Sequence, residues 1–117
     1  MRLKWNLNTA MTTKLGAKIK ELRKQREMTL DVLAEAADMS KSYLWELENR
    51  DSPKPSAEKL TALARALSMD VSFFLEEDVS EPLERHVDQA FFRNYAQLDP
   101  EAKEQVRKIM ETFRKKP

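Results

Sequence analysis

The chain has 117 residues, 35% of them charged, and a formal net charge of +1. It is too short for a large enzyme barrel, has no cysteine for a disulfide framework or thiolate site, and has a single histidine, too few for common zinc sites. Its one glycine excludes a glycine-rich phosphate loop, and no apolar run approaches the roughly 20 residues of a membrane span. We therefore expect a soluble, helix-rich, cytoplasmic protein without a cofactor.

The charge is unevenly distributed along the chain. Residues 1–26 contain eight basic residues and one acidic residue, whereas residues 76–84 contain five acidic residues and no basic one. A basic end on a nearly neutral protein is typical of a protein with an anionic partner. The alternative is an ordinary solvated helix face.

Residues 1–7 alternate apolar and polar side chains, which is the two-residue period of a strand. A short strand has no sheet to join in a helical chain, so it would pair with its copy in a dimer or form a basic arm. The alternative is that translation starts at Met11 and that the first ten residues are loosely ordered.

Five helices are predicted between residues 13 and 76. Apolar residues at helical spacing place them over residues 13–26, 29–36, 40–49, 56–67 and 71–75. Thr29, Ser40 and Ser56 stand where an N-cap is expected. Asp38 occupies the turn before the third helix, where aspartate tolerates a left-handed backbone less well than glycine does.

Two more helices are predicted after the acidic connector. Pro82 is expected in the first turn of one helix, and Asp99 is expected to cap the other, with Pro100 at its first position. Two amphipathic helices cannot bury their apolar stripes alone, so we expect a helical hairpin that dimerises or binds a partner protein. The alternative is that the apolar cluster folds back on the preceding domain. The cluster consists of Phe91, Phe92, Tyr95, Val106, Ile109, Met110 and Phe113.

The third helix has two chemically distinct faces. At about 100° per residue, Tyr43, Leu44 and Leu47 fall together on an inner face. The opposite face carries hydrogen-bonding groups of mixed charge, which is what base reading in a DNA groove requires. Its members are Lys41, Ser42, Trp45, Glu46 and Asn49.

Residues 15–76 resemble the Cro/phage-repressor (Xre) family of helix-turn-helix DNA-binding proteins. The matching residues are Thr29, Leu33, Ala34, Glu35, Ala37, Ser40, Ser42, Tyr43, Leu44, Leu47 and Glu48. The run over residues 40–44 is especially similar to Sin-type repressors, which append a helical hook for dimerisation. The resemblance implies an all-α fold with a five-helix domain, and a dimeric repressor that binds an inverted-repeat operator.

The resemblance also implies roles for individual residues. The family's base-reading positions correspond to Lys41, Ser42 and Glu46, and Trp45 beside them either contacts DNA or packs on its own chain. The family's phosphate-contacting positions correspond to Thr29, Leu30, Ser40, Tyr43, Asn49, Arg50 and Lys54. Arg23 and Glu48 match a pair that ties the first helix to the third. The family pattern is broken at Leu30, where glutamine is common, and at Asp38 and Arg50, where glycine is common.

We therefore expect an N-terminal arm or strand over residues 1–12, a DNA-binding domain over 13–76, an acidic linker over 77–81 and a helical hairpin over 82–117. The expected function is that of a homodimeric, sequence-specific DNA-binding repressor. The alternative is an antitoxin or peptidase-regulated repressor whose hairpin binds a partner protein. An enzyme is not expected, because His86 between Arg85 and Val87 is predicted to be a solvated side chain, and no metal is implied.

Overall fold

The computed structural model describes residues 15–50 and 54–114, and every regular element in these ranges is an α-helix. The elements are α2 (Leu15–Gln25), α3 (Leu30–Ala36), α4 (Lys41–Asn49), α5 (Ala57–Ala66), α6 (Val71–Leu75), α7 (Glu84–Ala96) and α8 (Pro100–Thr112). None of these helices is both long and apolar enough to span a membrane. The all-α prediction is confirmed, whereas the predicted strand at residues 1–7 lies outside the described residues.

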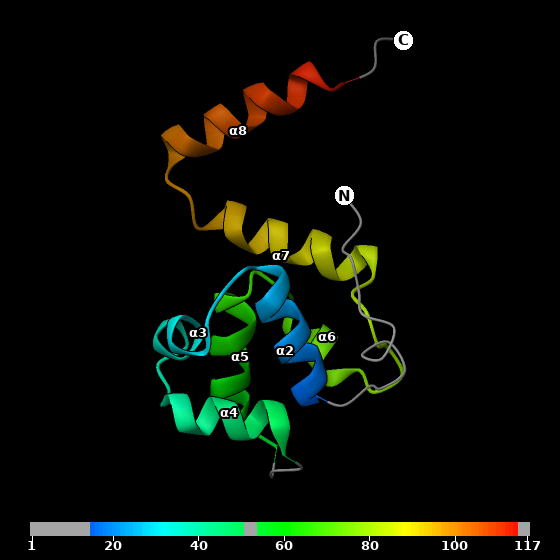
Figure 1. Cartoon of the computed structure of the whole chain (residues 1–117). Coiled ribbons are helices and arrows are strands. Elements are labelled where there is room, and N and C mark those ends of the chain that lie inside the picture. The colour runs from blue at the N-terminus through cyan, green and yellow to red at the C-terminus, as the bar shows by residue number, and fades with distance from the viewer. Residues whose placement is uncertain (1–14, 51–53, 115–117) are drawn as a thin grey trace.

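Helices α2 to α6 pack around one hydrophobic core (Figure 1). Helix α4 packs against α2 and α3, and α5 packs against α3 and α6. Each of the five helices buries apolar side chains in this core, and Ile19, Leu33, Leu44, Leu63 and Phe73 are fully buried. Full burial of such a side chain contributes about 1.5–3 kcal/mol, which stabilises helices too short to persist alone. We call α2 to α6 the helix-turn-helix unit.

Side-chain caps determine where the helices begin. The predicted N-caps Thr29, Ser40, Ser56 and Asp99 each accept a hydrogen bond from a backbone N–H of their helix, at 2.7 to 3.2 Å. Each bond satisfies one of the amides that the start of a helix leaves unpaired. The starts of α3, α4, α5 and α8 are therefore confirmed as predicted.

The ends of α2, α3 and α5 share one type of turn. Glu27, Asp38 and Ser68 have φ angles of 55°, 55° and 52°, so all three adopt the left-handed conformation. In each turn the next residue's N–H donates to the carbonyl five residues back, at 2.8 to 3.0 Å. This is the Schellman arrangement, in which glycine is the usual left-handed residue. The unfavourable backbone expected at Asp38 is confirmed, and the same geometry occurs twice more.

Helix α7 lies across one end of the helix-turn-helix unit, and α8 lies beyond it (Figure 1). Helix α7 begins at Glu84 with Leu83 as its N-cap, so the prediction that Pro82 lies in the first turn is wrong. The physical reason is a side-chain cap. The ring of His86 accepts the Leu83 N–H through Nδ1 at 2.9 Å, which places Pro82 outside the helix.

His86 is fully buried, so the prediction of a solvated histidine is also wrong. Helix α7 turns His86 and Ala90 toward the helix-turn-helix unit and leaves Val87 and Phe91 exposed. Apolar residues recur at Val87, Ala90 and Phe91, but the buried face of α7 is centred on His86 and Ala90 and so lies to one side of that stripe. The alternative in which the apolar cluster folds back on the core is also wrong, because none of the cluster's side chains is buried.

Candidate nucleic-acid interface

Helix α4 has the two faces that its sequence predicts. Leu44 and Leu47 are buried in the core, and Tyr43 is half-buried beside them. The other face is exposed and carries Lys41, Ser42, Trp45, Glu46 and Asn49. One face fixes α4 to the domain, and the other is accessible to a second molecule.

Trp45 is a large aromatic side chain on this accessible face, with 43% of its surface exposed. The Arg50 guanidinium lies 5.3 Å from the centroid of the indole ring, within cation–π range. The Arg50 Nη1 atom also lies 3.9 Å from Glu46 Oε1. These contacts hold the indole at the surface of α4 and do not draw it into the core.

Lys41 begins α4 beside the first turn of α3. Its Nζ lies 3.4 Å from Asp31 Oδ2, and the two side chains are 60% and 70% exposed. An ion pair between groups this exposed contributes only about 0–1 kcal/mol. Lys41 can therefore exchange Asp31 for another acceptor at little energetic cost.

The starts of α3 and α4 place backbone amides near the same surface. Thr29 and Ser40 are exposed, and each caps its helix through the side-chain oxygen. The remaining amides of the first turn, beginning at Leu30 in α3, keep the partial positive charge of a helix N-terminus. Both starts can thus attract an anionic group.

Three other predicted phosphate-contacting residues have partners within the chain. The ammonium of Lys59 in α5 lies 5.2 Å from the centroid of the Tyr43 ring. Lys20 Nζ donates to Asn49 Oδ1 at 3.3 Å, and Lys54 Nζ lies 3.4 Å from Glu77 Oε1. Sequence reasoning missed the two lysines from α2 and α5, because only the tertiary structure brings them beside Tyr43 and Asn49.

Two close contacts hold α4 against α2. Arg23 donates to both carboxylate oxygens of Glu48, from Nε at 2.7 Å and from Nη2 at 3.0 Å, which confirms the predicted pair. Gly16 lies against the end of α4, where a Cβ atom would come 2.3 Å from the carbonyl oxygen of Leu47. Together these contacts set the position from which α4 presents its exposed face.

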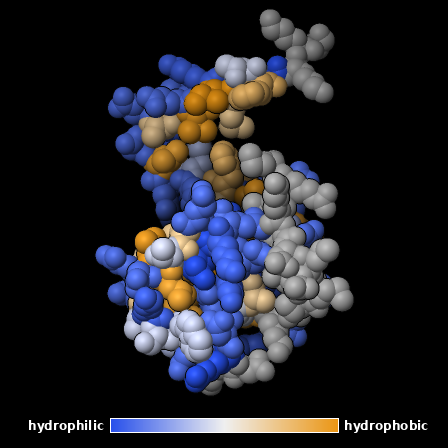
Figure 2. Space-filling view, viewed as in Figure 1, coloured by the Kyte–Doolittle hydropathy of each residue, from blue (hydrophilic) through white to orange (hydrophobic). Residues whose placement is uncertain are grey.

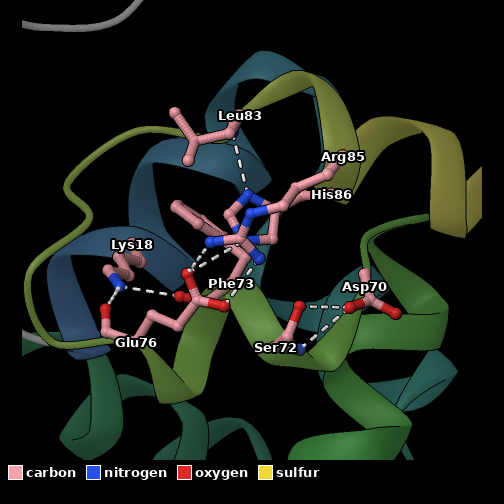
Figure 3. A network of polar contacts seen from close by, with 8 residues as sticks. All are labelled: Lys18, Asp70, Ser72, Phe73, Glu76, Leu83, Arg85 and His86. Atoms are coloured by element: carbon pink, nitrogen blue, oxygen red, sulfur yellow. Dashed lines mark hydrogen bonds and ion pairs between the residues drawn. The ribbon is translucent and has the colours of Figure 1, made fainter.

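Lys18 is a buried cation that sequence reasoning missed (Figure 3). Its Nζ donates to the carbonyl oxygens of Phe73 at 2.7 Å and Glu76 at 2.6 Å, at the C-terminal end of α6. The ammonium therefore neutralises the negative end of that helix, while burial lowers the pKa of Lys18. A sequence signal existed, because Lys18 lies three residues after Leu15 and four before Leu22, on the apolar stripe of α2.

The predicted cluster on α7 and α8 is largely exposed, and we call its side chains together the C-terminal surface. Its members are Phe91, Phe92, Tyr95, Val106, Ile109, Met110 and Phe113. Phe92, Ile109 and Phe113 are 62%, 60% and 80% exposed, and α8 buries none of its described residues. Figure 2 shows hydrophobic residues gathered along α8 in the upper part of the view. Within residues 15–50 and 54–114, these side chains are therefore left largely uncovered.

Comparisons with known proteins agree with the fold. Residues 14–72 match the family described as Helix-turn-helix domain. The chain is 44% identical over 64 residues to the immunity repressor protein of Bacillus phage phi105, a match covering 55% of this chain and 44% of that protein. It is 35% identical over 63 residues to the transcriptional regulator SinR of Bacillus subtilis, covering 54% and 57%. The matches thus span about half the length of these curated relatives, whose names describe regulators and not enzymes.

Two solved structures are similar to the chain. SinR in complex with DNA, described as the master regulator for biofilm formation, aligns with a TM-score of 0.51 at 34% identity, covering 53% of this chain and 98% of that one. The SinR protein/SinI protein complex aligns with a TM-score of 0.51 at 30% identity, covering 84% and 80%. The resemblance expected from the sequence is confirmed, and the chain belongs to the helix-turn-helix domain family.

Proposed function

We propose that the chain is a DNA-binding transcriptional repressor that reads an inverted-repeat operator as a dimer, with α4 in the major groove. The observation that carries this proposal is the exposed face of α4, backed by buried leucines. Two similarities support it. SinR has been solved in complex with DNA, and the phage relative is named as an immunity repressor.

The exposed side chains of α4 match different base edges. Lys41 suits the O6 and N7 acceptors of guanine, and Glu46 suits the amino group of cytosine. Ser42 is permissive, and the indole of Trp45 suits the methyl group of thymine. This set favours a site of mixed base composition over a uniform A·T tract.

The residues around α4 are proposed to contact phosphates and so set the register on the duplex. They are Thr29, Leu30 through its amide, Ser40, Tyr43, Asn49, Arg50 and Lys54. Lys20 and Lys59 add positive charge beside Asn49 and Tyr43. We expect binding to weaken steeply with salt, because each neutralised phosphate releases counterions.

Replacing Lys41 with alanine is expected to remove discrimination at one base position, by about 1–3 kcal/mol or about 5- to 150-fold. The weak pair with Asp31 does not compete with a bidentate contact to guanine. A site is first selected from random duplexes with the unaltered chain. The affinities of both proteins are then measured on that site and on its single-base variants.

Lys108→Ala is the matched control, because it removes the same charge from an exposed position in α8. It is expected to retain the base preference of the unaltered chain. If Lys41→Ala keeps the same preference at every position, α4 is not the reading helix.

We propose that the four parts of the chain divide this work. Residues 13–76 bind DNA, and residues 1–12 form an arm beside them. Residues 77–81 connect this domain to residues 82–117, which join two copies of the chain. Two half-sites about one helical turn apart require two α4 helices on one face of the duplex. The uncovered C-terminal surface provides an apolar area from which such a dimer can form.

Replacing Phe92 and Ile109 together with glutamate is expected to convert a dimer into a monomer. Both side chains are more than half exposed, so the charges would disrupt association without entering the core. Light scattering on the full chain gives the mass directly. Gln89→Glu and Gln105→Glu together form the matched control, because they add the same charge at exposed polar positions of the same helices.

A second candidate function is binding of another protein by the C-terminal surface. The alignment with the SinR/SinI complex favours it, because coverage of 84% of the chain extends beyond the helix-turn-helix unit. The same light-scattering experiment separates the two candidates. A monomeric unaltered chain would exclude self-association and leave the surface to a different protein.

A further inference from the structure

His86 joins α7 to the helix-turn-helix unit through a buried ring (Figure 3). The ring lies 5.4 Å from that of Phe73 in the core, measured between centroids. Its Nδ1 accepts the N–H of Leu83 at 2.9 Å. An imidazole nitrogen that accepts carries no proton, so the structure holds the neutral tautomer with hydrogen on Nε2.

The charges around this ring come from every element packed against it. The Glu76 carboxylate, just after α6, lies 3.3 Å from Nε2. Arg85 precedes His86 in α7 and binds Glu76 through both of its terminal nitrogens. Lys18 of α2 lies across the Phe73 ring, and Asp70, at the start of α6, is ion-paired with α7. The charges that act on the His86 ring are therefore those of Arg85, Glu76 and Asp70.

The Glu76 carboxylate already accepts hydrogen bonds from Arg85. Hydrogen bonding to Arg85 lowers the pKa of Glu76 to about 2, so this group stays ionised throughout the mildly acidic range. Among the described residues, Nε2 of His86 has no aligned hydrogen-bond acceptor, despite its closeness to Glu76. In this arrangement Nδ1 of the neutral ring makes a hydrogen bond, whereas Nε2 makes none with good geometry.

Few contacts hold α7 in place. His86 and Ala90 are the only residues of α7 that are buried. Ion pairs from Arg85 to Glu76 and from Arg93 to Asp70 lie at the rim. The Arg85 side chain is more than half exposed, so solvent screens its pair with Glu76, and the buried part of the contact is made by His86 and Ala90. The docking of α7 therefore depends on the state of His86.

We propose that neutral His86 fastens α7 to the helix-turn-helix unit, and that a proton taken up at Nδ1 releases it. Protonation would place the new N–H against the N–H of Leu83, two donors facing each other. The hydrogen bond that caps α7 would be lost, and a cation would form in the first turn, where the helix dipole disfavours it. Release of α7 does not require DNA and can be tested without it.

Acid is expected to favour the released form. Burial, aided by Arg85, lowers the pKa of His86 below its ordinary value of 6.5, and the attraction of Glu76 only partly opposes this. The released ring binds a proton more readily than the docked ring. The contribution of neutral His86 to docking is therefore fully present above pH 6.5, and docking weakens below it by at most about tenfold per pH unit.

The test is amide hydrogen exchange of the full chain at pH 7.5 and pH 5.5, corrected for the intrinsic effect of pH on exchange. We expect protection of the Ala90 and Phe91 amides in α7 to fall at pH 5.5, by up to about tenfold. Protection of Leu63 and Ala64 in α5 is expected to remain unchanged. An equal loss in α5 would mean general unfolding and would overturn the proposal.

His86→Gln is the matched variant, because glutamine at this position of a capping box also accepts the N-cap amide but does not titrate here. It is expected to keep α7 protected at both pH values. A fall in protection as large as in the unaltered chain would contradict the role of His86. His86 is the only histidine in the chain, so its ring signal can be titrated directly by NMR. A ring pKa at or above 6.5 in the docked chain would refute the mechanism even if the variant failed to fold.

Discussion

Replacing Gly16 with alanine is expected to destabilise the helix-turn-helix unit by about 3 kcal/mol, the upper end for overpacking a tight contact. The added Cβ would lie 2.3 Å from the Leu47 carbonyl oxygen and 2.9 Å from that of Glu48. Both obstacles are backbone atoms of α4 and cannot rotate away, so α2 and α4 must separate. The better helix propensity of alanine, about 0.5–1 kcal/mol, offsets only part of this.

The measurement is urea unfolding followed by circular dichroism. Lys24→Ala is the control, because it introduces the same residue at an exposed position of the same helix. It is expected to change the free energy of unfolding by less than about 0.5 kcal/mol. A Gly16→Ala variant as stable as the control would show that α2 and α4 do not approach as closely as described.

Replacing Glu48 with alanine is expected to cost about 3 kcal/mol of stability, because it strands the charge of Arg23 in a nearly buried position. The two side chains are only 12% and 1% exposed, and the carboxylate accepts two hydrogen bonds from the guanidinium. Arg23 would keep one partner, since its Nη1 also donates to the Met28 carbonyl at 2.9 Å. That bond places the expected loss at the lower end of the range for broken buried pairs.

Glu46→Ala provides the comparison on the same helix. Glu46 is exposed, and its distance of 3.9 Å to Arg50 marks a weak pair, so little stability should be lost. A double-mutant cycle with Arg23→Ala isolates the coupling between Arg23 and Glu48. Equal losses from Glu48→Ala and Glu46→Ala would mean that the buried pair does not hold α4 to α2.

Local sequence signals predicted the helix-turn-helix unit well. Capping residues such as Ser40 act within one turn of the chain, so their effect can be deduced from neighbouring residues. The faces of α4 follow from helical periodicity, because one strong apolar stripe is buried in one core. The roles of Lys41 and the other candidate site residues remain predictions, since they depend on a second molecule.

The errors concern α7, where the deciding contact is distant in sequence. The apolar spacing groups Val87, Ala90 and Phe91 on one stripe, yet of these three α7 buries only Ala90, together with His86, which was expected to be solvated. The reason is the interface with Phe73, which accepts a flat ring that is capped by a neighbouring amide. No local pattern encodes that preference, because it arises from a core side chain 13 residues earlier.

The left-handed turns that end α2, α3 and α5 are positions at which the domain can gain stability. Each holds a residue other than glycine at a position where glycine would relieve the backbone. Glu27 and Ser68 lie outside the turn that leads into α4. A single substitution to glycine at Glu27 or Ser68 would therefore raise the melting temperature of the domain, while α4 keeps its exposed side chains. The stability of the domain can thus be changed at these turns independently of the exposed face of α4.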